Sequence, residues 1–124
     1  MEIKAIKKRD GSTQPFDLEK IVVAIAAAFA ESGEGNRDIA QEVAELAYKK
    51  VVAMCVQAGV ATSDDPKANK CIDGNPTVEE IQDLVEQALM ERDFFTTAKT
   101  YIIYRNERKK LRERDIFAPR MNLK

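Results

Sequence analysis

The chain opens with two short extended segments. Apolar and charged residues alternate loosely over residues 2–9, a mainly polar run that ends in Phe16 precedes the first helix, and Asp10 and Gly11 lie between the two runs. An Asp-Gly pair between extended runs is a strong hairpin signal, because glycine accepts the positive φ that a tight turn requires. We predict strands over 2–9 and 12–16, and Pro15 places the second strand at an edge or near its end.

Two helices are predicted after this hairpin. Asp17 has the position of an N-cap, and the helix that it begins should end near Ser32 and Gly33. Asn36 is the predicted cap of a second helix that runs to about Gly59. Apolar residues recur every three or four positions in both segments, which gives each helix one apolar face. These residues are Leu18, Ile21, Val22, Ile25 and Phe29 in the first helix, and Ile39, Val43, Leu46, Ala47, Val51, Met54 and Cys55 in the second.

Turn-forming residues dominate the next segment, 59–76. We predict a long loop there, with one short strand around Lys70–Ile72. A loop of this length is unusual in a compact domain, and it indicates either a functional segment or an insertion. The sequence leaves both alternatives open.

The second half of the chain predicts two more helices. Thr77 and Glu80 have the spacing of a capping box, which starts a third helix. A break near Arg92–Asp93 separates it from a fourth helix that ends near Arg114. The inward residues are Val78, Ile81, Leu84, Val85, Ala88 and Leu89 in the third helix, and Phe95, Ala98, Tyr101 and Ile102 in the fourth. We therefore expect an α+β fold in which a small β-hairpin or three-stranded sheet covers a four-helix bundle, with one domain over 1–114 and a linker or tail over 115–124.

The composition is that of a folded domain that lacks histidine, the commonest general base. The chain has 124 residues, of which 44% are hydrophobic and 33% charged, and it contains no His. The missing imidazole excludes a Ser-His-Asp or Cys-His nucleophile, a zinc site with a His ligand and a haem His. We expect Cys55 to pack as a small apolar residue and Cys71 to be a loop thiol. No signal peptide or membrane-spanning run is evident, so a cytoplasmic location is expected.

Charge is segregated along the chain although the total is only -1. The net charge is +3 over residues 1–9, -10 over 10–98 and +6 over 99–124. Two solvated basic segments would explain this pattern. The alternative is that both ends meet in the fold and face one polyanion.

Two basic segments carry the candidate chemistry. Lys7, Lys8 and Arg9 directly precede the Asp-Gly turn, and Lys20 falls in the first turn of the next helix. Such cations and free backbone N–H groups suit a nucleoside triphosphate, although an exposed basic turn has the same sequence. In the fourth helix, Arg105 and Arg108 lie beside tyrosines that stack on a base or pack in a core. The same basic helix also suits a nucleic-acid-binding module, against which the net charge argues weakly.

Four sequence blocks occur in a particular order. They are Ile6–Gly11, Pro15–Ile21, Thr77–Glu86 and Ala98–Arg108. Together they resemble the ATP-cone domain, the allosteric nucleotide-binding module of ribonucleotide reductases, over about residues 2–114. The length of the connection 55–76 departs from the family, so no loop contacts are inferred there.

The resemblance implies specific nucleotide-binding roles. It assigns the phosphates to Lys8, Arg9 and Lys20, and the base and sugar to Ile6, Gln14 and Ile21. Thr77 would approach from the third helix, and further contacts would come from Lys99, Tyr104, Arg105 and Arg108. The implied effectors are ATP as activator and dATP as inhibitor, with Mg²⁺, in a domain that catalyses no reaction itself.

The resemblance also implies partners. The domain would act on other subunits of a ribonucleoside-diphosphate reductase and would self-associate through the cone when dATP binds, with no membrane partner and nucleic acid unexpected. Residues 116–124 resemble the entry into a radical-generating small subunit, whereas cones usually precede the large catalytic subunit. The sequence leaves open that choice, the number of nucleotides bound, and whether the chain is part of a longer protein.

Overall fold

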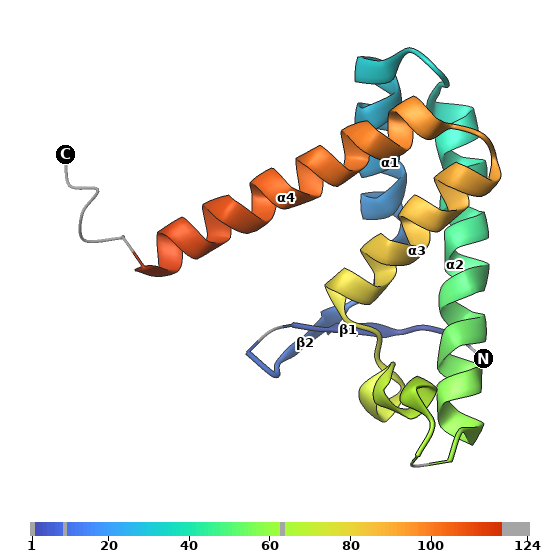
Figure 1. Ribbon diagram of the computed structural model, residues 1–124, viewed down its shortest axis with the longest axis vertical. Helices are drawn as coiled ribbons and strands as arrows, with labels where there is room; N and C mark the ends of the chain where they lie inside the picture. The colour runs from blue at the N-terminus through green and yellow to red at the C-terminus, as the bar shows by residue number, and fades with distance from the viewer. Residues whose placement is uncertain (1, 9, 63, 118–124) are drawn as a thin grey trace.

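Four helices and a small hairpin make up the fold (Figure 1). The computed structural model describes residues 2–8, 10–62 and 64–117, with side chains described as far as Lys110 except that of Lys67. The elements are β1 (Ala5–Lys7), β2 (Thr13–Pro15), α1 (Leu18–Ser32), α2 (Arg37–Val60), the short 3-10 helices η1 (Pro66–Asn69) and η2 (Ile72–Gly74), α3 (Val78–Glu91) and α4 (Phe95–Phe117). The predicted α+β class is confirmed.

The sheet is smaller than predicted. The strands β1 and β2 pair antiparallel, with Ile6 opposite Gln14, and each has three residues. Within the described part of the chain, the sheet has two strands, so the three-stranded alternative is not confirmed. In place of a third strand, Thr77 forms a single parallel bridge with Lys7. The strand predicted around Lys70–Ile72 is wrong, because positive φ angles at Cys71 (49°) and Asp73 (57°) turn the chain into η2.

The predicted helix signals form the expected caps. The Asp17 carboxylate accepts a hydrogen bond from the Glu19 amide (3.0 Å), and the Asn36 side chain accepts one from the Ile39 amide (3.0 Å). Gly33 ends α1 with a φ of 78°, and its amide donates to the Phe29 carbonyl (2.7 Å). Local side-chain chemistry therefore sets where these helices begin and end.

The core lies between the helices. The helix α2 packs against α1 and α3, and α4 crosses both α1 and α3 (Figure 1). The largest fully buried apolar side chains are Phe29, Ile25, Leu89, Val22, Val43, Val51, Val85 and Pro76. The ring of Phe29 meets that of Phe94 edge to face, with centroids 5.0 Å apart.

The start of α4 differs from the prediction. Phe95 was expected in the core but is 56% exposed, because Asp93 turns the chain with a φ of 64° and Phe94 packs on Phe29 instead. Thr97 is fully buried and donates from its backbone amide (2.7 Å) and its hydroxyl (2.6 Å) to the Glu34 carboxylate. These hydrogen bonds lower the pKa of Glu34. The loop between α1 and α2 therefore supplies the group that caps the N-terminus of α4.

Cys55 and Cys71 form a disulfide, with Cα atoms 5.3 Å apart. The expectation of a loop thiol at Cys71 is wrong, because η1 packs along α2 and returns the chain to Cys55 on that helix. Cys55 is buried as predicted, and Cys71 is buried with it.

The last helix continues beyond its predicted end. It reaches Phe117 rather than Arg114, and its C-terminal half extends away from the other helices (Figure 1). The predicted linker over 115–124 lies for the most part outside the described residues. None of the helices in the described ranges is both long and apolar enough to cross a membrane.

Candidate functional site

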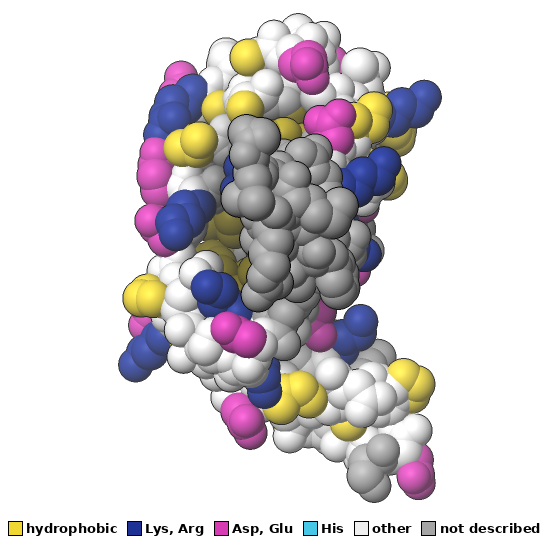
Figure 2. All heavy atoms as spheres, turned by 90° about the vertical axis from the view of Figure 1, so that its left-hand side faces the viewer, with side chains coloured by type: hydrophobic (Ala, Val, Ile, Leu, Met, Phe, Trp, Pro, Cys, Tyr) yellow, Lys and Arg dark blue, Asp and Glu magenta, His cyan; other side chains and the backbone are white. Residues whose placement is uncertain are grey.

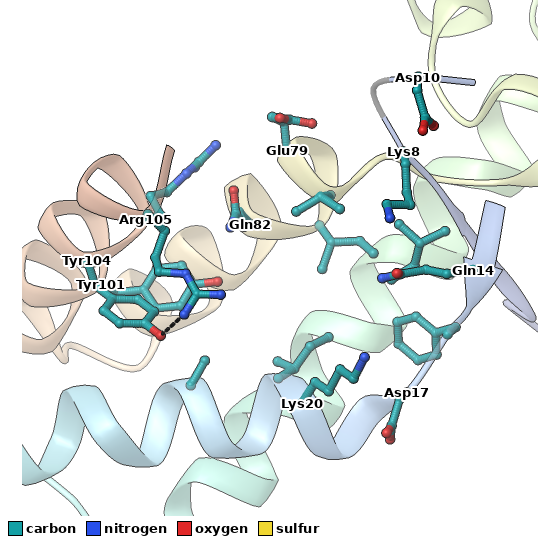
Figure 3. A pocket seen from close by; sticks show the side chains of 17 residues that line it. Lys8, Asp10, Gln14, Asp17, Lys20, Glu79, Gln82, Tyr101, Tyr104 and Arg105 are labelled. Atoms are coloured by element: carbon teal, nitrogen blue, oxygen red, sulfur yellow. Dashed lines mark hydrogen bonds between the residues drawn. The ribbon is translucent and has the colours of Figure 1, made fainter. Parts of the chain in front are cut away.

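A cleft of about 700 Å³ opens between the hairpin, the beginning of α1, the beginning of α3 and the middle of α4 (Figure 3). Its volume falls within the range of sites for small molecules and cofactors. The hairpin is thus one wall of a site rather than only a cover for the core. The lining residues are Ile6, Lys8, Asp10, Gln14, Phe16, Asp17, Lys20, Ile21, Ala24, Val78, Glu79, Ile81, Gln82, Tyr101, Tyr104, Arg105 and Arg108.

The tight turn of the hairpin holds Lys8 at the rim of the cleft. The Lys8 amide donates to the Ser12 carbonyl (2.8 Å), and the Gly11 amide donates back to the Lys8 carbonyl (3.0 Å). Gly11 has a φ of 88°, which a glycine adopts without strain. The Asp10 carboxylate accepts hydrogen bonds from the hydroxyl (2.5 Å) and the amide (2.9 Å) of Ser12, and these lower the pKa of Asp10. This acid therefore braces the turn.

Three polar side chains converge inside the cleft. Figure 3 shows the ends of Lys8, Gln14 and Lys20 pointing into the same space, whereas Asp17 points away from it. Lys8 and Gln14 come from the hairpin, and Lys20 comes from the first turn of α1. Two cations beside a helix N-terminus create a positive potential that favours an anionic group.

The surface of the cleft next to the core, beneath Lys8, Gln14 and Lys20, is apolar. Ile6, Phe16 and Ile21 are partly buried against the core, and Ile81 is 5% exposed. The ring of Phe16 is supported from below by Tyr48, with centroids 5.4 Å apart. An apolar floor under a cationic rim suits a ligand that has one flat, weakly polar part and one anionic part.

The helix α3 contributes residues that sequence reasoning did not select. Val78, Glu79, Ile81 and Gln82 line the cleft. Val78 and Ile81 were predicted only as core, and neither Glu79 nor Gln82 was assigned to a site. Val78 and Gln82 are one helical turn apart, so the capping box that fixes the start of α3 could have indicated that both face the same side.

The hydroxyl and the amide of Thr77 are both engaged in the capping box at the start of α3. Its hydroxyl accepts from the Glu80 amide (3.0 Å), and the Glu80 carboxylate accepts from the Thr77 amide (3.0 Å). Thr77 does not line the cleft, so its position beside the cleft is that of an anchor for α3.

The arginines of α4 differ in their partners. Arg105 donates to Asp83 (2.8 Å) and to Glu86, and only 17% of its side chain is exposed. Desolvation lowers the pKa of Arg105, but the hydrogen bonds to Asp83 and Glu86 outweigh it, so that its pKa is raised. Arg108 lies over the Tyr104 ring, 5.7 Å from its centroid, and donates to the Tyr104 hydroxyl (3.3 Å; dashed in Figure 3). Arg108 therefore has fewer competing anions than Arg105.

Tyr101 lies at the inner end of the wall that α4 forms in the cleft. Its side chain is 5% exposed, and burial raises the pKa of its hydroxyl. The phenol is therefore neutral at physiological pH, and it adds no negative charge to the cleft.

Most of the predicted site residues come together here. Eight of them line the cleft, namely Ile6, Lys8, Gln14, Lys20, Ile21, Tyr104, Arg105 and Arg108. Lys99 is exposed on α4 and does not line it, and Arg9 lies outside the described residues. Of the two basic segments, Lys8 from the first and Arg105 and Arg108 from the second line this one cleft, which favours the polyanion alternative for these three residues.

The metal-ligating residues and the surface charge further describe this part of the molecule. Among the residues whose placement is described, no group of three or more His, Cys, Asp or Glu side chains could hold a metal ion. Figure 2 shows Lys and Arg side chains interspersed with Asp and Glu on the face drawn there. The coloured part of this face therefore differs from the uniformly basic surface typical of nucleic-acid binding.

Comparison with known proteins gives consistent matches. The family model of the ATP cone domain matches residues 4–110. A vitamin B12-dependent ribonucleoside-diphosphate reductase of Thermoplasma acidophilum is 36% identical in an alignment 116 residues long that covers 90% of this chain. A protein of the same description from Mycobacterium tuberculosis is 34% identical over 107 residues, or 86% of this chain.

A third relative carries a related description. The ribonucleoside-diphosphate reductase subunit alpha of Chlamydia pneumoniae is 32% identical in an alignment 113 residues long that covers 84% of this chain. The matches cover 13%, 13% and 9% of these three relatives, so the chain spans a small part of each.

Proposed function

This chain belongs to the ATP-cone family, and on that basis we propose that it binds ATP and dATP in the cleft between the hairpin and α1, α3 and α4. ATP cones are nucleotide-binding regulatory domains, and the relatives that match are reductases. The observation that carries the proposal is the convergence of Lys8, Gln14 and Lys20 over an apolar floor.

The triphosphate lies against the cations in this proposal. Lys8 and Lys20 approach it from opposite walls, Arg9 adds a third charge, and Arg108 closes the site from α4. Micromolar affinity corresponds to about -8 kcal/mol. Several charge-assisted hydrogen bonds, each contributing roughly 1.5–3 kcal/mol, account for that value after the cost of ordering the ligand.

The adenine and ribose lie on the apolar floor. Ile6 and Ile21 contact the faces of the rings, and Tyr104 adds a stacking surface at the end of the cleft. The amides of Gln14 and Gln82 supply both donors and acceptors for the base edge. This division places the anionic part of the ligand at the rim and its flat part on the floor.

Mg²⁺ enters with the triphosphate in this proposal. The described residues offer no carboxylate cluster that could hold the ion unaided. Mg²⁺ keeps several waters and binds readily through phosphate oxygens. The phosphates and water therefore supply most of its ligands, and no step depends on a protein-bound ion.

The two nucleotides have opposite effects in this proposal. ATP activates a ribonucleotide reductase, and dATP inhibits it by favouring self-association through this domain. The difference requires a coupling free energy of about 1–3 kcal/mol between the cleft and the associating surface. The domain catalyses no reaction itself. The names of its relatives favour a large catalytic subunit as the protein that carries this domain, rather than the small subunit that residues 116–124 resemble.

Calorimetric titration with ATP and dATP tests the proposal. We expect Lys20→Ala to lower the affinity for both nucleotides at least tenfold, because a phosphate loses a charged partner. This change corresponds to about 1.4 kcal/mol of binding free energy. Lys99→Ala is the matched control: it removes the same charge from an exposed site outside the cleft, and its affinities should equal those of the unaltered chain. Absence of binding at millimolar nucleotide would overturn the proposal.

A gel shift separates this function from nucleic-acid binding by α4. We expect no shift of duplex DNA or of RNA at either low or physiological salt. A shift that weakens steeply with salt, together with absent nucleotide binding, would instead assign the basic helix to a nucleic acid.

A further inference from the structure

We propose that the disulfide between Cys55 and Cys71 is a redox switch that sets the affinity of the nucleotide cleft. The bond joins α2 to the residue that precedes η2. The switch deepens the function proposed above and rests on it, because the property that it changes is nucleotide affinity.

The first link runs from the disulfide to the cap of α3. One oxygen of the Glu80 carboxylate, Oε1, accepts hydrogen bonds from the Cys71 amide (3.4 Å) and from the Thr77 amide (3.0 Å). The Thr77 hydroxyl accepts in return from the Glu80 amide (3.0 Å). The half-cystine and the first turn of α3 thus share a single acceptor.

The second link runs from the same segment to the hairpin. The Lys7 amide donates to the Pro76 carbonyl (2.9 Å), and Lys7 forms the parallel bridge with Thr77. Pro76 is fully buried, which fixes this junction to the core. In Figure 1 the segment that carries η1 and η2 lies beside both the hairpin and the end of α2.

Two walls of the cleft therefore depend on one tethered segment. Ile6 and Lys8 flank Lys7 in the chain, and Val78 and Glu79 follow Thr77 directly. All four line the cleft. Residues 71–77 consequently fix the spacing between the hairpin wall and the α3 wall, although none of them lines the cleft.

The backbone around Cys71 is strained. Cys71 and Asp73 have φ angles of 49° and 57°, which residues other than glycine rarely adopt. Such conformations persist only where the surrounding structure holds them. Opening the disulfide removes one of the constraints on Cys71, and the segment can then relax toward ordinary φ values and loosen its hold on Glu80 and Thr77.

The redox step is a thiol–disulfide exchange with a dithiol reductant. One thiolate of the reductant attacks a sulfur of the Cys55–Cys71 bond, which releases one cysteine and leaves the other in a mixed disulfide with the reductant. The second thiol of the reductant then attacks this mixed disulfide and releases the other cysteine. Two electrons and two protons pass to Cys55 and Cys71, which become thiols, and the reductant becomes a cyclic disulfide.

The exposed turn beside the disulfide and the reducing compartment both support a switch. Cys55 and Cys71 are 4% and 6% exposed, but Ile72, Asp73 and Gly74 beside them are exposed, so opening of this short turn would admit a reductant. Nucleoside triphosphate effectors act where thiol buffers are reducing, and disulfides there are usually transient or redox-sensing.

Amide hydrogen exchange tests the structural link without any nucleotide. The chain is compared after oxidation and after treatment with dithiothreitol, and circular dichroism verifies that both forms are folded. We expect reduction to lower the protection of the Lys7, Thr77 and Glu80 amides while the middle of α2 keeps its protection. Equal protection in the two forms, or free thiols at both cysteines after oxidation, would overturn the switch whether or not the chain binds nucleotides.

Titration of the same two forms with ATP tests the effect on affinity. We expect the dissociation constant of the reduced form to be about three- to tenfold higher. The double variant Cys55→Ala/Cys71→Ala should match the reduced form and ignore dithiothreitol. Equal affinities of the oxidised and reduced forms contradict the switch, and so does a double variant that still responds to dithiothreitol. Absence of binding by both forms contradicts the proposed function instead, and hydrogen exchange then decides whether the structural link exists.

Discussion

The carboxylate of Glu34 accepts two hydrogen bonds from Thr97, a residue 63 positions later in the chain. One comes from the backbone amide and one from the hydroxyl, which also lies 2.6 Å from the Ser32 hydroxyl. The first turn of α4 leaves amides without helical partners, and Glu34 satisfies one of them. The loop after α1 thereby sets where α4 begins, and α4 in turn carries Tyr104 and Arg108 to the cleft.

Acid should weaken this anchor. The hydrogen bonds from Thr97 lower the pKa of Glu34 below its ordinary value of 4.5, so the folded state favours the ionised form. The resulting stability is fully present above pH 4.5 and is lost as the pH falls through the lowered folded-state pKa. Urea unfolding of Glu34→Gln should therefore show a smaller loss of stability below pH 4.5 than the unaltered chain.

Glu31→Gln is the matched control for this measurement, because Glu31 is an exposed carboxylate in the last turn of α1, three residues before Glu34. It removes an equal charge but none of the hydrogen bonds from Thr97, so it should not reproduce the effect of Glu34→Gln. If Glu34→Gln and the unaltered chain lose stability in parallel between pH 5 and pH 2, the anchor does not depend on the charge of Glu34.

Arg105 should behave mainly as a structural residue. It pairs with Asp83 and Glu86, and the Arg105 and Glu86 side chains are only 17% and 18% exposed. Arg105→Ala should lower the free energy of unfolding by about 1–2 kcal/mol, between the values typical of exposed and buried pairs. Arg105→Ala should lower the affinity for ATP less than Lys20→Ala does, because the donors of Arg105 already have partners.

A double-mutant cycle with Glu86→Gln measures this pairing directly. We expect the two single changes to be coupled in the unfolding free energy. Additive effects on stability, combined with a large loss of ATP affinity in Arg105→Ala, would instead assign Arg105 to the phosphates.

The capping box should contribute measurably to stability. Thr77→Ala removes the acceptor of the Glu80 amide and should cost about 1 kcal/mol in the free energy of unfolding. Thr77→Ser keeps the hydroxyl and should stay close to the unaltered chain. Chemical denaturation of both variants provides the measurement, and equal losses would show that the methyl group of Thr77, rather than its hydroxyl, is important.

Two glycines should respond oppositely to alanine. A Cβ at Gly35 would lie 2.9 Å from ring atoms of Phe29, a ring already confined by Phe94, so Gly35→Ala should destabilise the fold by about 1–3 kcal/mol. Gly59 is in α2 with nothing within 4 Å of such a Cβ, and Gly59→Ala should stabilise it by about 0.5–1 kcal/mol. Thermal unfolding of both variants distinguishes the two cases.

Local signals predicted most of this fold. Asp17, Gly33, Asn36 and Thr77 act through hydrogen bonds to backbone groups a few residues away, so the sequence alone indicates where the helices begin and end. Where contacts join distant segments, the prediction failed. A break was predicted near Arg92–Asp93, but the sequence does not show that Phe94, rather than Phe95, packs on Phe29 of α1.

The errors around the disulfide have the same origin. The pairing of Cys55 with Cys71 depends on how η1 folds back along α2, and no local pattern in the sequence encodes that return. The cleft was predicted in part, because the cations that line it follow recognisable turns and caps. Gln82 was missed because its role follows only from the packing of α3 beside the hairpin.

The outward course of α4 makes that helix a lever. Tyr104 lies at the cleft, and the helix continues to Phe117, clear of the other helices (Figure 1). At 1.5 Å of rise per residue, this arm is about 20 Å long. A change of a few degrees in the tilt of α4 at Tyr104 therefore becomes a displacement of an ångström or more at its far end. Small rearrangements at the cleft are amplified in space by the length of one helix.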